Sequence, residues 1–205
     1  MVLQEERKGN RRGITMDIVL ASQSPRRVQL LGQMGLTFRV HAVDIDEHMD
    51  RRLSPGELVK AISREKAAAC AALEGPEALI IAADTVVAKG DAVLGKPHSA
   101  DEAREMLRLL SGCEHHVYTG FTLRQGERVV TDVVSTAVTF RPLSDAEIDA
   151  YIATGEPMDK AGAYGIQEKG ALLVDHLQGD YFNVMGLPVC QLGLVLKHFG
   201  VECLA

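Results

Sequence analysis

The first third of the chain alternates between an apolar run and an amphipathic stretch. Residues 17–22 form an apolar run that predicts a buried strand, and it leads directly into a predicted helix. Ser24 stands at the N-cap position and Pro25 at the first helical position, two residue types that favour a helix start. Gly35 predicts the end of this helix, and residues 38–43 alternate weakly enough to suggest a second strand.

A second helix is predicted from a capping box at residues 54–57 to about Leu73. At 100° per residue, one narrow apolar face collects five side chains: Val59, Ile62, Ala69, Cys70 and Leu73. Lys66 falls inside this apolar arc. A lysine in that position must extend to solvent, form an ion pair or bind a ligand.

The middle of the chain predicts a short buried strand at residues 78–83 and a hairpin at 85–94. Another capping box, at residues 99–102, begins a helix that Gly112 ends. Four side chains of this helix have core spacing: Ala103, Met106, Leu107 and Leu110.

The second half predicts two longer strands, one more helix from a third capping box, a late strand and a final helix. In chain order these cover residues 116–123, 129–140, 144–152, 172–177 and 188–199. Because helices and strands alternate at first and a hairpin then intervenes, the expected fold class is α/β, with a mixed twisted sheet and flanking helices. The chain shows no internal repeat.

Composition is that of a packed globular protein. The 205 residues are 46% hydrophobic and 24% charged and include no Trp. A chain of this length buries about 70% of its unfolded surface, enough for one domain without staples. We expect a flexible leader over residues 1–15 and one domain over 16–205, built as two lobes around a cleft.

Charge and cysteine usage narrow the setting. The net charge of −6 disfavours non-specific nucleic-acid binding, and the one basic run lies in the leader, where it is expected to be a solvated tail. The four cysteines form no CxxC pair, which favours a reducing cytoplasm. No apolar stretch approaches the roughly 18–20 residues that span a bilayer.

The first candidate for chemistry is the junction between the first strand and helix. A helix N-terminus leaves backbone N–H groups unpaired and attracts anions, so Ser24, Arg26 and Arg27 are candidate phosphate ligands. Guanidinium groups bind phosphate oxygens in bidentate fashion. The alternative is a solvated arginine pair beside an ordinary cap.

Two further candidates are the helical Lys66 and Asp84, which ends the apolar run ALIIAAD. A carboxylate beyond a strand end can hold a divalent ion or accept a proton from water. A structural ion pair for the lysine, and a turn-capping role for the aspartate, remain alternatives.

Residues 90–97 match the pattern GxxxxGK but do not form a phosphate-binding loop. Pro97 stands where Ser or Thr is needed for magnesium, and Val93 and Leu94 belong to a predicted strand. Lys96 stays a candidate phosphate contact.

A glycine-rich segment, residues 155–167, carries the last candidates. Glycines allow a close approach of the backbone to a ligand, Lys160 offers charge, and the amide of Gln167 can pair with a base edge. An ordinary loop is the alternative. His115 and His116 are adjacent on a predicted strand and point to opposite faces, so they cannot chelate together.

Taken together, these segments resemble the Maf family of nucleotide pyrophosphatases. The matching motifs, in the family's order, are LASQSPRR (Leu20 to Arg27), REKA (Arg64 to Ala67), AADTVV (Ala82 to Val87), LGKP (Leu94 to Pro97), GEPMDKAGAYGIQ (Gly155 to Gln167) and GDYFNVMGLP (Gly179 to Pro188). Each motif is weak alone, and six in order are specific. The AGAYGIQ form resembles the branch that acts on dTTP and UTP, although Glu168 stands where that branch leads us to expect Gly.

The resemblance implies a fold similar to that of the inosine triphosphate pyrophosphatases, with a deep cleft. It implies cleavage of a nucleoside triphosphate to the monophosphate and pyrophosphate with a divalent cation, Mg²⁺ or Mn²⁺, and it allows a homodimer. By the resemblance, Asp84 is the proton acceptor and Glu47, or in its place Asp46, is near the metal. It further assigns Lys66 and Lys96 to the phosphate site, and it links Arg26, Thr85 and Gln167 to substrate choice.

The resulting hypothesis is a hydrolase in which basic residues hold the triphosphate and Asp84 activates water for attack on the α-phosphorus. Two alternatives stay open. One is a non-enzymatic nucleotide- or nucleic-acid-binding regulator of septum formation, and the other is a pyrophosphatase for purine or modified nucleotides.

Overall fold

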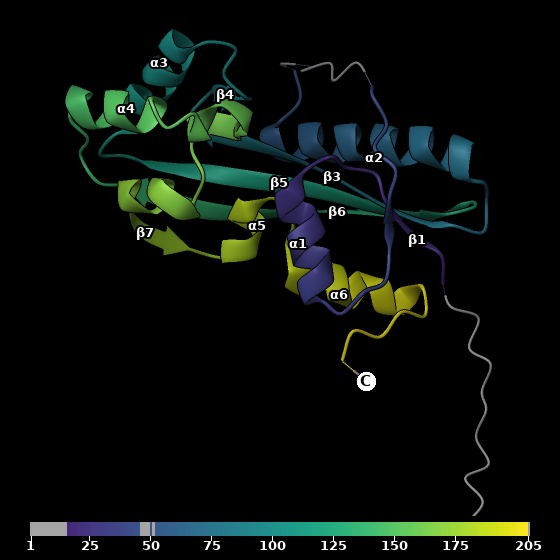
Figure 1. Cartoon of the computed structure of the whole chain (residues 1–205). Coiled ribbons are helices and arrows are strands. Elements are labelled where there is room, and N and C mark those ends of the chain that lie inside the picture. The colour runs from purple at the N-terminus through teal and green to yellow at the C-terminus, as the bar shows by residue number, and fades with distance from the viewer. Residues whose placement is uncertain (1–15, 46–49, 51, 205) are drawn as a thin grey trace, which may run out of the picture.

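The computed structural model describes residues 16–45, 50 and 52–204, so the predicted leader and Glu47 lie outside the described residues. Seven strands form one sheet, in the order β2-β1-β3-β5-β6-β7, and β4 pairs with β3 (Figure 1). The strands are β1 (Ile18–Leu20), β2 (Arg39–Val40), β3 (Leu79–Lys89), β4 (Ala92–Leu94), β5 (Glu114–Gln125), β6 (Arg128–Phe140) and β7 (Val174–Gln178). β1 runs parallel to β2 and β3, whereas the other pairs are antiparallel. The predicted mixed α/β sheet is confirmed.

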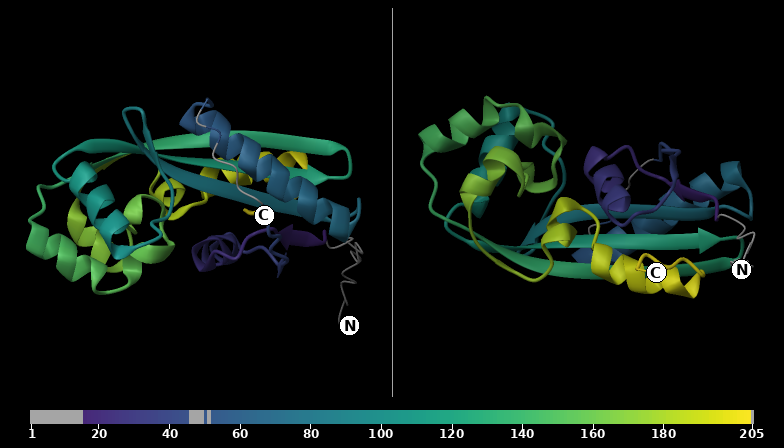
Figure 2. Two further views of the ribbon diagram at one scale, coloured as in Figure 1. Left: turned by 90° about the horizontal axis from the view of Figure 1, so that it is seen from above. Right: turned by 60° about the horizontal axis from the view of Figure 1, so that its bottom comes forward.

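Helices cover both faces of this sheet. They are α1 (Pro25–Gln33), α2 (Pro55–Glu74), α3 (Ala100–Leu110), α4 (Asp145–Ile152), α5 (Tyr181–Met185) and α6 (Val189–His198). α2 lies on one face of the long strands, and α1 and α6 lie on the other (Figure 1). α3 and α4 gather at one end of the long strands, away from α1 and α6 (Figure 2). The division of the domain into two lobes stays a prediction.

β3 is one continuous strand of eleven residues, so the predicted break after Ala83 is wrong. The break was placed there because Asp84 interrupts an apolar run. The strand in fact continues past it, since β5 pairs with β3 from Ile80 to Ala88 without interruption. Two different strands pair with the opposite edge of β3. β1 pairs with residues 79–81 and β4 with residues 87–89, and among the described residues no strand pairs with the interval between them.

Side chains of β3 alternate between the two faces of the sheet. Ile81 and Ala83 pack in the cluster that contains α1 and α6, whereas Ile80 and Ala82 pack against α2. This alternation directs Asp84 toward α2 and Thr85 toward α1 and α5.

The predicted apolar face of α2 is partly wrong. Leu73 is 67% exposed, and Ala67 is buried in its place. The buried face rotates along the helix, from Leu58 and Ile62 at its start to Ala67 and Cys70 near its end. We attribute the rotation to the straight helix crossing a twisted sheet, which meets a different arc of the helix at each turn.

α2 approaches the backbone of β5 closely at Gly120. A Cβ atom at that position would lie 2.6 Å from the carbonyl carbon of Val59 and 2.8 Å from the nitrogen of Lys60. The Ser63 hydroxyl, next along the same face, is hydrogen-bonded to Thr122 at 2.9 Å. The missing side chain therefore sets how deep α2 sits on the sheet.

The C-terminal third contains short elements that the hydrophobic pattern did not predict. Three 3-10 helices, η1 (Glu156–Asp159), η2 (Ala161–Ala163) and η3 (Glu168–Leu173), occupy the glycine-rich segment and the residues after it. η3 delays β7 to Val174, two residues later than predicted, and α5 was not predicted. The second predicted strand has only the two residues of β2.

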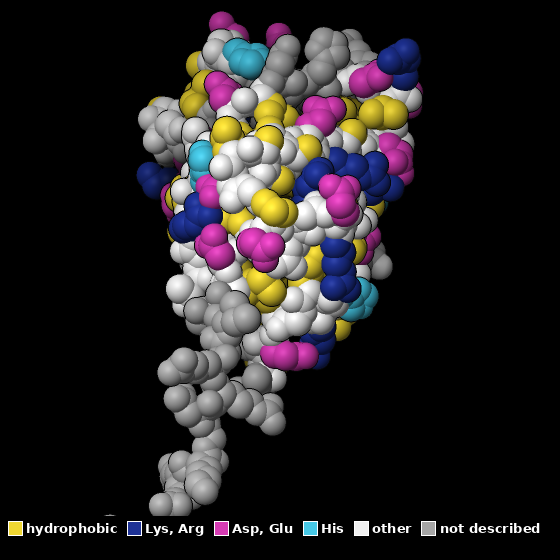
Figure 3. All heavy atoms as spheres, turned by 90° about the vertical axis from the view of Figure 1, so that its right-hand side faces the viewer, with side chains coloured by type: hydrophobic (Ala, Val, Ile, Leu, Met, Phe, Trp, Pro, Cys, Tyr) yellow, Lys and Arg dark blue, Asp and Glu magenta, His cyan; other side chains and the backbone are white. Residues whose placement is uncertain are grey.

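Charges are mixed in sign on the face drawn in Figure 3, where Lys and Arg side chains are interspersed with Asp and Glu. No helix in residues 16–45, 50 and 52–204 combines the length and apolarity needed to cross a bilayer.

Candidate active site

A cleft of about 1160 Å³ opens along the unshared interval of β3. The predicted site residues that the structure describes all line it: Ser24, Arg26, Arg27, Lys66, Asp84, Thr85, Lys96, Lys160 and Gln167. They come from segments up to 143 positions apart (24 to 167), so the fold brings the separate motifs to one surface. The predicted position of Glu47 is not described.

Asp84 and Lys66 form an ion pair at the floor of the cleft. The Lys66 ammonium lies 2.7 Å from Asp84 Oδ1, and each side chain is only 11% exposed. Lys66 reaches Asp84 because it projects from the face of α2 that covers β3. Asp84 lies in mid-strand and not at a strand end as predicted, yet it borders the cleft because β1 has already ended at Leu20.

Arg27 is buried and organises the floor on the other face of the sheet. Its Nε donates to the Gly186 carbonyl at 2.8 Å, and its Nη2 donates to Thr85 Oγ1 at 3.1 Å. The Thr85 and Thr119 hydroxyls lie 2.9 Å apart, and Thr119 donates to the Asn183 carbonyl at 2.9 Å. Since Thr119 has one hydroxyl hydrogen, Thr85 donates to Thr119 and accepts from Arg27. The orientation of Thr85 is therefore fixed by α1, β5 and α5.

Arg26 lies at the rim, unlike its neighbour. Its Nη1 donates to Asp159 Oδ2 at 2.9 Å, which links α1 to η1. The Lys160 ammonium donates to the other carboxylate oxygen at 2.7 Å and to the Glu156 carbonyl at 2.7 Å. Burial alone raises the pKa of Asp159, but the hydrogen bonds from Lys160 and Arg26 outweigh it and hold that pKa below its ordinary value.

Asp159 was missed at the sequence level. It stands in the glycine-rich segment beside Lys160, and a carboxylate next to a candidate phosphate ligand was the one signal available. Its partner Arg26 is 133 positions away, so only the tertiary structure joins them.

The predicted N-cap at Ser24 and helix start at Pro25 are confirmed. Ser24 occupies the N-cap position with extended dihedral angles but makes no side-chain cap. Instead the Ser24 N–H donates to Ser22 Oγ at 3.2 Å, and the same oxygen accepts a hydrogen bond from Arg27 Nη1 at 3.2 Å. The Ser22 hydroxyl thus joins the backbone at the start of α1 to the buried Arg27 side chain.

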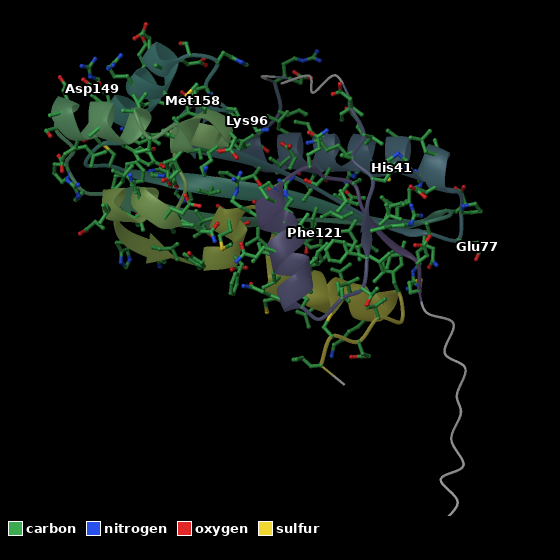
Figure 4. The ribbon with its side chains drawn as sticks, viewed as in Figure 1. His41, Glu77, Lys96, Phe121, Asp149 and Met158 are labelled. Atoms are coloured by element: carbon green, nitrogen blue, oxygen red, sulfur yellow. The ribbon has the colours of Figure 1, made fainter. Side chains whose placement is uncertain are left out.

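Lys96 is exposed on the cleft wall just after β4, between the η1–η2 region and the start of α2 (Figure 4). Its neighbours Val93 and Leu94 are in β4, which confirms that this segment is not a phosphate-binding loop.

Gln167 lies at the N-cap of η3, and a buried network fixes the turn around it. Glu156 Oε1 accepts from the Gly170 N–H at 3.1 Å and from the Tyr151 hydroxyl at 2.9 Å. The Tyr151 hydroxyl in turn accepts from the Gly165 N–H at 3.1 Å. Glu156 was not singled out from the sequence, although it belongs to the matching motif.

The glycines of residues 155–167 were expected to allow a ligand close to the backbone, whereas Gly170, just after that segment, allows a close contact within the protein. A Cβ at Gly170 would lie 1.9 Å from the Gly165 carbonyl oxygen. Glu168 adopts a positive φ of 53°, the left-handed region that favours glycine. This conformation explains why a glycine suits the position after Gln167, and it means that Glu168 holds the turn under strain.

The donor set of the cleft suits a hard divalent cation. Carboxylates of Asp44, Asp50 and Asp91 line it together with Asp84. Mg²⁺ takes oxygen ligands, commonly one or two carboxylates with substrate phosphates and water completing the shell. The cleft thus offers both carboxylates and basic side chains.

The chain is similar to several known proteins. The profile of the family described as Maf-like protein matches residues 17–199. A dTTP/UTP pyrophosphatase of Moorella thermoacetica is 51% identical over 187 residues, 90% of this chain and 96% of that protein. Proteins of the same name from Bacillus cytotoxicus and Bacillus velezensis are 48% and 47% identical, covering 88% and 92% of this chain and 94% and 100% of their own lengths. The Ham1 protein of Staphylococcus aureus is similar in structure with a TM-score of 0.45 and 14% identity, covering 60% of this chain and 71% of its own.

Proposed function

This chain belongs to the Maf-like protein family, and we propose that it hydrolyses dTTP and UTP to the nucleoside monophosphate and pyrophosphate. The observation that carries the proposal is the Lys66–Asp84 pair at 2.7 Å on the floor of a cleft with further basic side chains on its walls. A carboxylate beside an ammonium, at a surface that attracts polyanions, is suited to phosphate-anhydride hydrolysis.

The basic side chains bind the triphosphate in this proposal. Lys96 is exposed and lines the cleft. Arg26 becomes available to the substrate when its ion pair with Asp159 breaks. The first turn of α1 adds backbone N–H donors beside them, with the positive end of the helix dipole. Lys66 has a second task, since its ammonium also orients the Asp84 carboxylate. Charge that builds on the leaving pyrophosphate is thereby stabilised.

Asp84 accepts a proton from the attacking water. Its carboxylate is oriented by the hydrogen bond from Lys66 to Oδ1. Water attacks the α-phosphorus, the bond from that phosphorus to the bridging oxygen of the β-phosphate breaks, and pyrophosphate leaves. The proton passes from water to the carboxylate and then to solvent.

We further propose that the cleft holds a divalent cation, Mg²⁺ or Mn²⁺, for which Asp84 would be a ligand. When bound, such an ion neutralises phosphate charge and acts as a Lewis acid. Asp44 and Asp50, which also line the cleft, are further candidate ligands, and Glu47 keeps that role as a prediction.

Base selection is assigned to Thr85 and Gln167. Uracil and thymine share an O4, N3–H and O2 edge, and an amide that both donates and accepts can pair with it. The Glu156 network holds Gln167 at the rim, and the Arg27 bond orients Thr85. A site that tolerates both bases leaves room for the 5-methyl group and does not require a 2′-hydroxyl.

The setting and assembly are part of the proposal. The four cysteines are free thiols, in keeping with a reducing compartment, and we propose the cytoplasm. A homodimer and the lack of a nucleic-acid partner stay predictions.

The test is pyrophosphate release from a panel of triphosphates, with and without EDTA. We expect dTTP and UTP to be cleaved at similar rates and EDTA to stop the reaction. A strong preference for purine triphosphates would replace this substrate assignment. No release from any triphosphate, together with retained nucleotide binding, would favour the non-enzymatic regulator.

A further inference from the structure

A second group of metal-ligand side chains lies outside the cleft, where the end of α2 meets β2. His41 follows β2 directly, and Cys70 and Glu74 stand in the last turns of α2. The ring nitrogen, sulfur and carboxylate oxygen of this cluster all lie within 4.8 Å of one another. None of the three residues lines the cleft. We propose that His41, Cys70 and Glu74 bind a zinc ion that fastens α2 to the edge of the sheet.

The donor types select the metal. Imidazole nitrogen, thiolate sulfur and carboxylate oxygen are the ligands of protein-bound Zn²⁺, whereas Mg²⁺ and Ca²⁺ take oxygen. Cys70 and Glu74 are four positions apart on one helix, so both point from the same face. His41 supplies the third ligand from another element and is partly exposed (labelled in Figure 4), which leaves room for water as the fourth.

A second layer of residues already supports the carboxylate. Glu74 Oε1 contacts His41 Nδ1, while Oε2 accepts from Arg39. Arg39 is itself held by Asp17, at 3.0 Å from Nε and 2.9 Å from Nη2. A ligating carboxylate that is hydrogen-bonded by an outer partner is the usual construction of a protein metal site. Oε1 can therefore turn to a metal while Oε2 keeps Arg39.

With Cys70 as a thiolate, a divalent cation would balance the charges of this group. Glu74, Asp17 and the thiolate then carry three negative charges, and Arg39 carries one positive charge. Binding the metal requires the Cys70 thiol to give up its hydrogen, so zinc binding would release a proton.

Such an ion would steady one wall of the cleft. β2 has only two residues, both exposed, and it depends on β1 for its pairing. The segment after His41 carries Asp44 to the cleft wall. A bond from α2 to His41 would anchor this segment at its start.

The experiment is a zinc titration of the full chain, first stripped with a chelator under reducing conditions. We expect one equivalent to bind and to raise the midpoint of thermal unfolding. Cobalt(II) in place of zinc should give the absorption of a thiolate-bound metal. Cys70→Ser and His41→Gln should each weaken binding at least about 100-fold, since loss of outer partners alone costs 10–100-fold. Both should abolish the thermal shift.

Matched variants separate this site from adventitious binding and from the cleft. Cys190→Ser removes an exposed thiol of α6 and should leave the affinity unchanged. Asp84→Asn alters the cleft and should also leave it unchanged. Equal zinc binding by wild type and His41→Gln, or a cobalt complex without thiolate absorption, would overturn the proposal. His41 is partly exposed, so its variant is expected to fold, as far-UV circular dichroism can verify.

Discussion

Two ion pairs face the same cleft and differ in depth. Lys66 and Asp84 meet at 2.7 Å with 11% of each side chain exposed, whereas Arg26 and Asp159 meet at 2.9 Å with 24% and 58% exposed. A charge interaction strengthens as the surroundings become less polarisable, and dissolved salt weakens it most at the surface. The deep pair is therefore a fixed part of the floor, and the rim pair can exchange partners.

The difference suggests a division of labour. The floor holds the group that activates water in one geometry, because α2 and β3 both restrain it. The rim holds Arg26 with a carboxylate that a phosphate can replace, since both are anions that bind a guanidinium in the same way. In the proposed function, the buried Lys66–Asp84 pair takes part in the chemistry and the exposed Arg26–Asp159 pair takes part in substrate binding.

The largest expected effect is at the deep carboxylate. Asp84→Asn keeps the size of the side chain and removes the proton acceptor, so kcat should fall by at least about 10²–10⁴-fold. Steady-state kinetics with dTTP, alongside a thermal melt to show a folded variant, measures it. Normal turnover would remove Asp84 from the mechanism, and rescue at high metal concentration would assign it to metal binding alone.

The second-largest expected effect is on the free energy of unfolding, at the Lys66–Asp84 pair. Lys66→Met removes the ammonium beside a mostly buried carboxylate, which should lower the free energy of unfolding by about 2 kcal/mol. The double variant Lys66→Met with Asp84→Asn should recover part of the loss, because the carboxylate charge is then gone as well. Urea denaturation of the four proteins forms the cycle. Strictly additive losses would show that the two side chains are not coupled.

Backbone strain is the third test, at the residue that follows Gln167. Glu168 has a φ of 53°, so Glu168→Gly should raise the free energy of unfolding by up to about 1 kcal/mol. The control is Lys169→Gly, an exposed neighbour without positive φ, which should instead destabilise the protein. A destabilised Glu168→Gly variant would mean that the carboxylate makes a contact worth more than the strain.

The rim pair itself should give a smaller change. Exposed ion pairs contribute about 0–1 kcal/mol, so Asp159→Asn should lower KM by no more than about fivefold as Arg26 is released to the substrate. kcat should hardly change. The difference should shrink in high salt. A large fall in kcat would mean that Asp159 takes part in the reaction, so the two ion pairs would no longer differ in role.

The smallest effect is the pH dependence of that pair. Because the folded-state pKa of Asp159 is lowered, its contribution to stability is present above the ordinary carboxyl value and is lost as the pH falls through the lowered value. Wild type and Asp159→Asn should therefore differ in stability by a constant amount between pH 5 and 8, and the gap should close below about pH 4. A gap that varies between pH 5 and 8 would point to a different titrating partner.

Sequence reasoning was strongest where hydrophobic spacing was regular. The core side chains of α3 were predicted correctly, because each lies on one face of a helix with clear caps. β3 was cut short because nearly all of its residues are buried on both faces, so no alternation marks the strand and Asp84 resembles its end.

The sequence identified residues that line the cleft but not the contacts between them. Arg26 and Arg27 were treated alike, although Arg27 is three and four positions before the buried Leu30 and Leu31, a spacing that places it on the inner face of α1. The contact between Arg26 and Asp159 spans 133 positions, and no local pattern records it. The 3-10 helices were missed because their glycine-rich sequence has no regular period.

Gly120 sets how closely α2 approaches the sheet, and with it the position of Lys66. A methyl group at position 120 would clash with the backbone of α2 at Val59, and a rigid helix relieves such a clash by tilting. Lys66 is two helical turns after Val59, so the tilt would move its ammonium away from Asp84 without any change to either residue. A substitution at Gly120 would therefore alter the site without changing any residue that lines the cleft.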